Sequence, residues 1–240
     1  MKLDVLAFAA HPDDVELACS GTICKLVSEG KKVGVVDLTR GELGSRGSAE
    51  LRDQEAAEAA KIMGLSVREN LRFRDGFFKN DEAHQLAIIR MIRRYQPELI
   101  LINAPADRHP DHGRGSAVVR DAAFLSGLRK IETEWEGVSQ QAWRPKRHYF
   151  YIQDQSLTPD FVVDITDFFE QKNKAIQAYS SQFFVPSTDR DEPQTYISSQ
   201  DFWHFLEARA REFGHRAGVR LGEGFISERP LLIRDITSLI

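Results

Sequence analysis

Apolar runs alternate with segments of helical periodicity through the first half of the chain. Strand-like runs cover residues 3–10, 32–39, 70–74 and 99–103. Between them, apolar residues recur at helical spacing over residues 15–29, 49–63, 82–95 and 114–125. Strands separated by helices of this length predict right-handed crossovers and a largely parallel sheet flanked by helices. We therefore expect an α/β fold.

Local signals sharpen several of these elements. Ser48 and Asp81 stand where each can cap the helix that follows, and Gly64 stands where the helix over 49–63 should end. The run over 99–103 is the most hydrophobic of the strands, which predicts a central position because strands buried on both faces are continuously apolar.

The second half is less regular. Residues 148–153 and 161–166 are strand-like, Asp167 can cap a helix over 167–181, another helix is expected over 201–216, and residues 223–233 have strand character. Residues 185–199 are polar and hold two prolines, which predicts a loop that either closes over a ligand or stays a solvated surface loop. No repeat or linker marks a boundary. We expect one domain over 1–240, with a core over 1–147 and a C-terminal elaboration over 148–240.

Composition limits the classes of function. The net charge is −4 and the isoelectric point is near 6.0, which argues against a nucleic-acid groove. No apolar stretch approaches the roughly 20 residues that span a bilayer, and no signal peptide precedes the first strand. Cys19 and Cys24, the two cysteines, are five positions apart on one predicted helix and are not expected to pair. We expect a cytoplasmic protein without nucleic-acid or membrane partners.

Two clusters of histidine and aspartate follow two of the strand-like runs. The first is His11-Pro12-Asp13-Asp14, and the second is His109-Pro110-Asp111-His112. Ligands of open α/β sheets bind at the carboxyl ends of the strands, so the two clusters can converge. A single cluster of this kind is also typical of a turn that caps a helix. The pair favours a metal site.

The clusters hold enough groups for metal-dependent hydrolysis. His11, Asp14 and His112 would supply the two imidazoles and one carboxylate of a catalytic zinc site. Asp13 would then be free to take a proton from water, and His109 could stabilise an oxyanion or protonate a leaving amine. Asp111 is a carboxylate that could hold His109.

A glycine-rich loop and several arginines surround these clusters in the sequence. Gly41, Gly44 and Gly47 do not match a dinucleotide fingerprint or a phosphate-binding loop, so we interpret residues 40–47 as a flexible loop near the ligand. Arg52 and Arg108 could bind a carboxylate or a sugar hydroxyl, as could Arg46. Each of them could equally be a surface arginine in an ion pair.

Together these residues resemble a known family. The segments Ala10-His11-Pro12-Asp13-Asp14-Val15-Glu16 and His109-Pro110-Asp111-His112 are similar to the PIG-L/LmbE superfamily of zinc-dependent N-acetylglucosaminyl deacetylases. The resemblance extends to the segments 39–42, 174–176 and 181–182 and to the helix with Arg52. Residues 213–214 and 223–225 resemble the bacillithiol-biosynthesis branch, whose members deacetylate N-acetylglucosaminyl malate.

The resemblance implies a Rossmann-like fold and assigns a role to each site residue. His11, Asp14 and His112 would bind Zn²⁺, or Fe²⁺ as in some relatives. Asp13 would be the general base, His109 the charged partner of the oxyanion and Asp111 the residue that orients it. Arg52 and Arg108 would contact the substrate. One departure is Val15, because some members have glutamate directly after the second aspartate; the role of Glu16 therefore stays open.

The resulting prediction is a zinc-dependent hydrolase that removes acetate from a small-molecule amino-sugar conjugate, first of all GlcNAc-L-malate, and that forms a homo-oligomer. The alternatives are another GlcNAc conjugate, such as an inositol or chitooligosaccharide, and a metal-dependent sugar-binding protein without catalysis. Asp13 distinguishes an enzyme from a sugar-binding protein, since a protein that only binds has no need of a free carboxylate beside the water. A nucleotide-binding oxidoreductase is disfavoured by the missing glycine fingerprint.

Overall fold

The computed structural model describes residues 1–183 and 193–238. Its centre is a seven-stranded sheet with the order β3-β2-β1-β4-β7-β9-β8. The strands are β1 (Val5–Ala9), β2 (Val33–Thr39), β3 (Val67–Phe73), β4 (Leu99–Asn103), β7 (Arg147–Tyr151), β8 (Phe161–Asp164) and β9 (Gly222–Ile226). The strands β3, β2, β1, β4 and β7 are parallel to one another, whereas β9 runs antiparallel to both β7 and β8. The expected α/β fold with a largely parallel sheet is confirmed.

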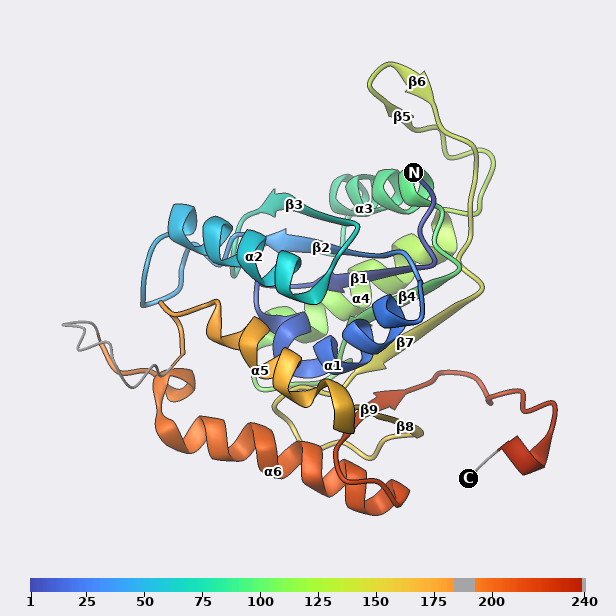
Figure 1. Cartoon of the computed structure of the whole chain (residues 1–240). Helices are drawn as coiled ribbons and strands as arrows, with labels where there is room; N and C mark the ends of the chain where they lie inside the picture. The colour runs from blue at the N-terminus through green and yellow to red at the C-terminus, as the bar shows by residue number, and fades with distance from the viewer. Residues whose placement is uncertain (184–192, 239–240) are drawn as a thin grey trace.

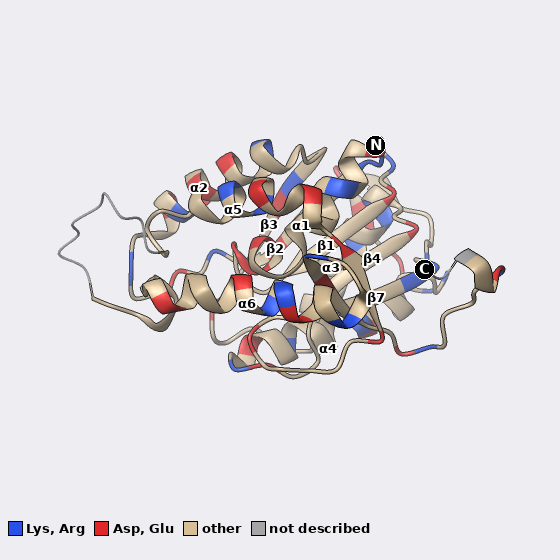
Figure 2. Cartoon of the chain, turned by 60° about the horizontal axis from the view of Figure 1, so that its bottom comes forward, with Lys and Arg blue, Asp and Glu red and all other residues tan. Residues whose placement is uncertain are grey.

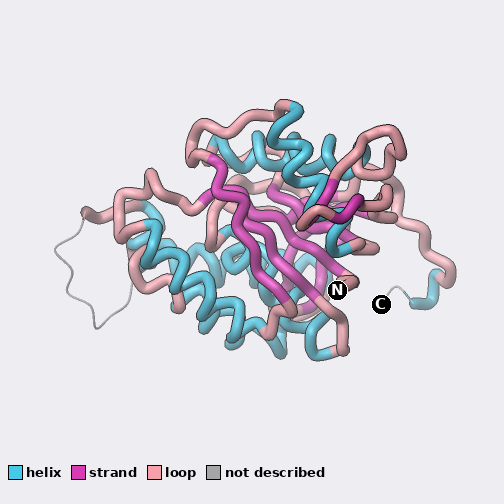
Figure 3. The backbone as a smooth tube through the Cα atoms, turned by 90° about the horizontal axis from the view of Figure 1, so that it is seen from above, coloured by secondary structure: helices cyan, strands magenta, loops and turns pink. Residues whose placement is uncertain are grey.

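Helices cover both faces of the sheet (Figures 1 and 3). One layer consists of α1 (Asp14–Ser28), α2 (Ala49–Met63) and α5 (Phe169–Gln177), and the other consists of α3 (Glu82–Tyr95) and α4 (Pro110–Leu125). The helix α6 (Gln200–Ala217) packs against β9 and β8. Figure 2 shows acidic and basic residues interspersed along the outer helices α2, α5 and α6. Among the described residues, none of the helices combines the length and apolar character that a bilayer crossing needs.

The strands β1 and β4 form the middle of the core. Every residue of β1 is buried, and β4 is the fourth of the seven strands, as its apolar sequence predicts. Side chains of β1 alternate between the two layers: Leu6 and Phe8 pack with α3 and α4, whereas Val5, Ala7 and Ala9 pack with α1. Burial on both faces excludes polar residues from the strand and leaves them at its end.

The predicted helix caps are present in the structure. The Ser48 hydroxyl accepts the Leu51 N–H at 3.2 Å, and the Asp81 carboxylate accepts the His84 N–H at 3.1 Å. Gly64 ends α2 with φ of 70°, a conformation that glycine adopts without a steric penalty. Both cysteines are buried and free, as expected.

Several boundaries differ from the prediction. The helix α4 begins at Pro110, four residues before the expected Arg114, because proline is well suited to the first helical position. The helix α5 ends at Gln177 rather than Ser181, since Ser181 donates its N–H and its hydroxyl to Glu55. Asp167 does not cap this helix and lies in the short 3₁₀ turn η1 (Thr166–Phe168).

The chain near the C-terminus also differs. The strand β9 stops at Ile226, and the following residues up to 235 form no helix or strand. The prediction missed the hairpin of β5 (Glu134–Trp135) and β6 (Val138–Ser139), whose turn has positive φ at Glu136 and Gly137. Of the predicted loop over 185–199, residues 185–192 lie outside the described residues, and η2 (Tyr196–Ser198) is a 3₁₀ turn.

Candidate metal centre

The two histidine–aspartate clusters meet at one edge of the sheet. His11, Asp13 and Asp14 follow the carboxyl end of β1, and His109 caps α4 after the carboxyl end of β4. These strands are neighbours, and the chain leaves them toward opposite sides of the sheet, with β2 and β3 on one side and β7 on the other. Such a switch in strand order leaves a crevice in which α/β proteins bind ligands.

The turn after β1 has an unusual backbone conformation. Asp13 has φ of 120°, a region that L-residues other than glycine rarely adopt. Its carbonyl accepts the Leu17 N–H at 2.9 Å, so the strained residue is also where α1 begins. Strain of this kind persists where surrounding contacts hold it in place and is concentrated at functional sites.

Asp14 lies against both of the other expected metal ligands. Asp14 Oδ1 lies 3.0 Å from His112 Nε2, and Asp14 Oδ2 lies 3.8 Å from His11 Nδ1. Asp14 and His112 are buried, and His11 is 9% exposed. One nitrogen of each imidazole therefore faces the carboxylate of Asp14. Two histidines and one aspartate are a donor set that suits Zn²⁺ or Fe²⁺.

The other nitrogen of each imidazole contacts carboxylates. His11 Nε2 lies 3.1 Å from Asp75 Oδ1 and 3.3 Å from Asp111 Oδ2, and His112 Nδ1 is hydrogen-bonded to Asp107. Histidines that bind metals characteristically use one nitrogen for the ion and give the other to a carboxylate or carbonyl, which fixes the tautomer and the ring orientation. The residues present therefore fit a metal ion held by His11, Asp14 and His112.

In the described part of the chain, two groups have ligand atoms that all lie within 4.8 Å of one another, and Asp14 belongs to neither. One is His11 with His109 and His112, and the other is His11 with Asp75 and Asp111. The second group contacts His11 through Nε2, on the side of the ring away from Asp14. The pairing of both imidazoles with carboxylates favours the set with Asp14.

Both oxygens of Asp14 are held by hydrogen bonds. Oδ2 accepts the side-chain N–H of Asn103 at 2.9 Å and the backbone N–H of His11 at 3.0 Å. Oδ1 accepts the side-chain N–H of Gln153 at 2.9 Å. Burial opposes ionisation of Asp14, but the adjacent imidazoles of His112 and His11 and the backbone N–H of His11 lower its pKa, so the carboxylate stays ionised.

The electrostatics of the histidines follow from the same contacts. Burial opposes the imidazolium form of His11, but its hydrogen bonds to Asp111 and Asp75 outweigh that effect and raise its pKa to about 10. His112 likewise is raised to a pKa of about 9 by Asp14 and Asp107, despite its burial. At neutral pH the raised pKa values leave each imidazole with a proton on both nitrogens. A metal ion must displace one proton from each ring, because it binds the neutral imidazole.

Asp13 is buried beside this group and contacts Arg52. Its Oδ2 lies 3.3 Å from Arg52 Nη1, which also donates to the Pro12 carbonyl at 3.2 Å. Burial raises the pKa of Asp13 to about 7, although the positive charge of Arg52 opposes the shift. A carboxyl whose pKa lies close to neutrality can accept and release a proton, which a general base requires.

His109 lies against the two other histidines. Its ring centroid is 4.6 Å from that of His11 and 5.3 Å from that of His112. Burial and the positive charges of these neighbours lower the pKa of His109. Its Nδ1 accepts the backbone N–H of Asp111 at 3.2 Å.

Asp111 has a different set of contacts from the one expected. Its carboxylate contacts His11, accepts the Gly76 N–H at 2.8 Å and forms an ion pair with Arg114. Asp111 contacts His109 through its backbone N–H instead. The structure therefore places the carboxylate of Asp111 on the predicted metal ligand His11.

The glycine-rich loop after β2 packs over Arg52. A Cβ atom at Gly41 would lie 2.9 Å from Arg52 Nη1, and one at Gly44 would lie 3.1 Å from Nη2. Leu43 of the same loop donates its N–H to Asp75 Oδ2 at 3.0 Å. Gly41 and Gly44 therefore make room for the guanidinium, which explains these two glycines without a phosphate ligand.

Arg108 and Arg46 are each engaged in contacts. Arg108 Nε lies 3.2 Å from Asp154 Oδ2, its guanidinium lies 4.8 Å from the centre of the Tyr196 ring, and its side chain is 53% exposed. Tyr196 donates to Asp154 Oδ1 at 3.0 Å. Arg46 donates to the Ser181 carbonyl at 2.8 Å. Arg52 is thus paired with the carboxylate of Asp13 beside the predicted ligands, and Arg108 lies nearer the solvent.

Glu16 lies in a buried ion-pair network. Its Oε1 accepts from Arg68 and, at 3.1 Å, from the Tyr179 hydroxyl, while Arg68 also forms a bidentate pair with Asp37 at 2.8 and 2.9 Å. Its second oxygen is buried without a hydrogen-bond partner among the described residues. Glu16 therefore connects α1 to β2, β3 and the turn after α5.

The sequence prediction missed the residues that hold the ligands, namely Asn103, Asp75, Asp107 and Gln153. One signal was available, because Asn103 ends β4 and Asp75 comes two residues after β3, where side chains of a parallel sheet gather at one edge. Nothing local marks Gln153, whose position depends on β7 lying next to β4.

Comparison with known proteins places this site in a family. The family model for PIG-L, GlcNAc-PI de-N-acetylase, matches residues 6–123, which include both clusters. A conserved protein from Thermus thermophilus with a solved crystal structure is 37% identical, with a TM-score of 0.86 over 98% of each chain.

Two curated relatives have named activities. Diacetylchitobiose deacetylase of Thermococcus kodakarensis is 26% identical over 92% of this chain and 81% of its own length. A probable N-acetyl-α-D-glucosaminyl L-malate deacetylase 2 of Bacillus cereus is 28% identical over 76% of this chain and 84% of its own length. Clusters, fold and relatives agree, and the chain belongs to the PIG-L family of N-acetylglucosaminyl deacetylases.

Proposed function

We propose that the protein is a metal-dependent deacetylase that releases acetate from an N-acetylglucosaminyl conjugate. The observation that carries the proposal is the convergence of His11 Nδ1 and His112 Nε2 on Asp14, with the buried carboxyl of Asp13 beside them. Zn²⁺ is the first metal to test and Fe²⁺ the second. A metal ion bound by these three residues would act as a Lewis acid and lower the pKa of a water ligand.

The chain's own residues supply the proton transfers and the orientation. Asp13 takes the proton from the attacking water, and its raised pKa of about 7 lets it release that proton later. His109, whose pKa is lowered and whose Nδ1 accepts the Asp111 N–H, donates its Nε2–H to the negative charge that develops on the amide oxygen, and the proton that Asp13 releases goes to the leaving amine. Asp111 orients the imidazole of His11 through its carboxylate and His109 through its backbone N–H. Arg52 keeps Asp13 in place, and its buried guanidinium is a suitable donor to a substrate hydroxyl.

GlcNAc-L-malate is the first substrate to test. Its support is the resemblance of residues 213–214 and 223–225 to the bacillithiol branch, together with the Bacillus cereus relative. Malate carries two carboxylates, and Arg108 at the partly exposed edge of the site is a suitable partner for one of them.

N,N′-diacetylchitobiose is the second candidate. The relative from Thermococcus kodakarensis matches 92% of this chain. In addition, Arg108 is already paired with Asp154, so a substrate carboxylate would have to displace an existing partner. A neutral second sugar would not need to do so.

An acetate-release assay tests the proposal. Metal-free protein receives Zn²⁺ or Fe²⁺ and is then given GlcNAc-malate, diacetylchitobiose, GlcNAc-inositol and free GlcNAc in parallel. We expect metal-dependent release, fastest from GlcNAc-malate. Preference for diacetylchitobiose would replace the malate assignment, and sugar binding without acetate release from any of the four would identify a binding protein instead.

The remaining expectations stay predictions about the whole protein. We propose a single catalytic domain over 1–240, because β7, β8 and β9 of the second half belong to the same sheet as β1–β4. A cytoplasmic homo-oligomer is the expected form, and sedimentation of the purified protein would test the association.

A further inference from the structure

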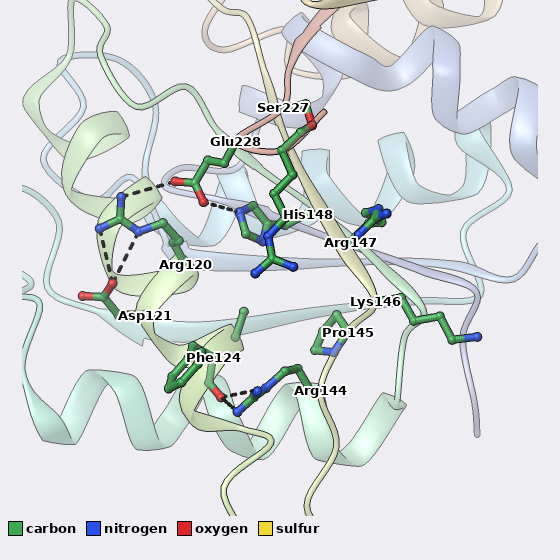
Figure 4. A pocket seen from close by; sticks show the side chains of 12 residues that line it. Arg120, Asp121, Phe124, Arg144, Pro145, Lys146, Arg147, His148, Ser227 and Glu228 are labelled. Carbon is green, nitrogen blue, oxygen red and sulfur yellow. Dashed lines mark hydrogen bonds and ion pairs between the residues drawn. The ribbon is translucent and has the colours of Figure 1, made fainter. Parts of the chain in front are cut away.

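A pocket lies at the end of α4 opposite the metal centre. It has a volume of about 550 Å³ and is bounded by residues 120–124 of α4, by residues 144–148 before and within β7, and by residues 227–229 after β9 (Figure 4). His112 and Phe124 are twelve residues apart on α4, which corresponds to about 18 Å along a helix. The pocket is therefore separate from the site that holds His11 and Asp14.

The side chains around this pocket are strongly basic. Five cationic side chains line it, against the two carboxylates of Asp121 and Glu228. The cationic residues are Arg120, Arg144, Lys146, Arg147 and Arg229. The chain as a whole has the opposite balance, with 32 lysines and arginines against 36 acidic residues. A local excess of positive charge in an acidic protein creates a potential that attracts anions.

Existing contacts neutralise only part of this charge. Lys146 pairs with Glu98 at 2.7 Å, and Arg144 donates to the Phe124 carbonyl at 2.8 and 3.2 Å. Arg120 reaches Asp121 and Glu228 only at 3.4 and 3.5 Å. Arg147 and Arg229 are exposed and form no ion pair within the described part of the chain.

Glu228 fixes the wall formed by the chain after β9. Its carboxylate contacts His148 Nε2 at 2.9 Å and Arg120 at 3.5 Å, and Figure 4 shows these contacts on one side of the pocket. Phe124 at the rim is 59% exposed, and the Arg144 guanidinium lies 4.3 Å from its ring centre. The pocket thus has a tethered wall, an aromatic rim and arginines with unused donors.

We propose that this pocket binds a small organic anion with two or more phosphate or carboxylate groups. Guanidinium groups donate paired hydrogen bonds that match both kinds of oxygen acceptor, and two unpaired arginines would suit a ligand with at least two charged groups. The volume lies within the usual range for small-molecule sites. The proposal does not depend on the deacetylase activity.

Titration calorimetry with fructose 1,6-bisphosphate tests the proposal. Fructose 6-phosphate is the probe with one charged group, and citrate is the probe for carboxylates. The variant Arg147→Glu/Arg229→Glu changes two exposed residues of the pocket. Arg211→Glu/Arg216→Glu is the matched control, because both arginines are exposed on α6 and the change in net charge is the same.

We expect the bisphosphate to bind more tightly than the monophosphate, and we expect the pocket variant to lose about tenfold or more in affinity while the control variant binds as the parent does. Citrate binding that follows the same pattern extends the ligand class to carboxylates, and its absence restricts the class to phosphates. Equal binding by the pocket variant and the control would overturn the proposal, since the anion would then bind elsewhere, for example at the metal centre.

Two further results would also overturn it. One is binding that added sodium chloride abolishes equally for the parent, the pocket variant and the control variant, because this would indicate unspecific attraction. The other is a parent protein that dimerises through this face, so that Arg147 and Arg229 meet a second copy. Sedimentation of the parent and the pocket variant distinguishes that case.

Discussion

All the groups proposed to bind metal or move protons lie in the first 112 residues, and the second half of the chain adds contacts that support them from a distance in sequence. His11, Asp13 and Asp14 follow β1, and His109 and His112 begin α4. From the second half, Gln153 donates to Asp14. The chemistry of the site is thus local to two strand ends, while its rigidity depends on distant segments.

The break in α1 shows how the second half acts. Cys19 has non-helical φ and ψ of −139° and 15°, so Gly21 and Thr22 donate their N–H groups to Glu223 of β9 at 3.0 and 2.7 Å. On the other side of the break, the Glu16 and Leu17 carbonyls accept from Lys172 of α5 at 3.1 and 2.9 Å.

Lys172 and Glu223 also pair with each other at 2.7 Å and are buried. Arg209 of α6 donates to the Leu17 carbonyl at 2.6 Å and to the Gln153 carbonyl. The helix α1, which carries Asp14 in its first turn, is therefore held on both sides of its break by three elements of the second half, namely α5, α6 and β9. The difference between the halves teaches that a metal ligand and its support can come from opposite ends of a sequence.

The largest effect is expected from Asp13→Ala. Loss of a general base lowers kcat by about 10²–10⁴-fold, while His11, Asp14 and His112 remain to bind metal. Steady-state acetate release and metal content by atomic absorption measure the two quantities. Asp13→Asn is the matched variant that keeps the shape, and near-normal turnover by either variant would remove Asp13 from its proposed role.

Lys172→Met should destabilise the fold by about 3–5 kcal/mol, because it leaves the buried carboxylate of Glu223 without its counter-charge. Urea denaturation measures the free energy of unfolding. The double variant Lys172→Met/Glu223→Gln should regain part of the loss, since it removes the unpaired charge. A single variant as stable as the parent would show that the second half does not support α1 in this way.

Gln153→Leu should weaken metal binding by about 10–100-fold, because Asp14 loses a donor that orients its carboxylate. Competition with a chromophoric chelator measures the affinity without any substrate. Gln155→Leu, an exposed change two residues away, is the control. Equal metal affinities for the two variants would assign the site's rigidity to the first half alone.

Arg108→Ala should have the smallest effect. We expect kcat/KM to fall roughly tenfold on GlcNAc-malate, through a lost charge-assisted hydrogen bond, and to change little on diacetylchitobiose. The two substrates serve as controls for each other. Equal losses on both would mean that Arg108 positions His109 or Asp154 and does not bind a carboxylate.

Much of the fold was predictable from local pattern. The alternation of apolar runs and helical periodicity predicted β1, β2, β4 and the helices between them, because burial on both faces of a sheet imposes continuous apolar runs. The hairpin of β5 and β6 was missed because its strands are two residues long and too short for a periodicity to register. The early start of α4 was missed because the cluster was interpreted as a loop although Pro110 favours a first helical position.

The candidate site was predictable only in part. The proposed ligands His11, Asp14 and His112 stand in two short motifs that each follow an apolar strand, so their convergence follows from the parallel sheet. The partners of these ligands were not predictable, because Asp75 contacts His11 across 64 residues and Gln153 contacts Asp14 across 139. Contacts of that span depend on strand order, which local periodicity does not specify.

The sequence by itself determined which side chains stand at the ends of β1 and β4, since an apolar strand must end where polar residues begin. The tertiary structure decided what those side chains contact. It brought the carboxylate of Asp111 into contact with His11 and packed the Arg52 guanidinium against the glycine-rich loop. It also brought the arginines of three separate segments into one basic pocket. The physical reason is that charged groups are stabilised by partners in space, and the packing of layers selects those partners irrespective of their distance along the chain.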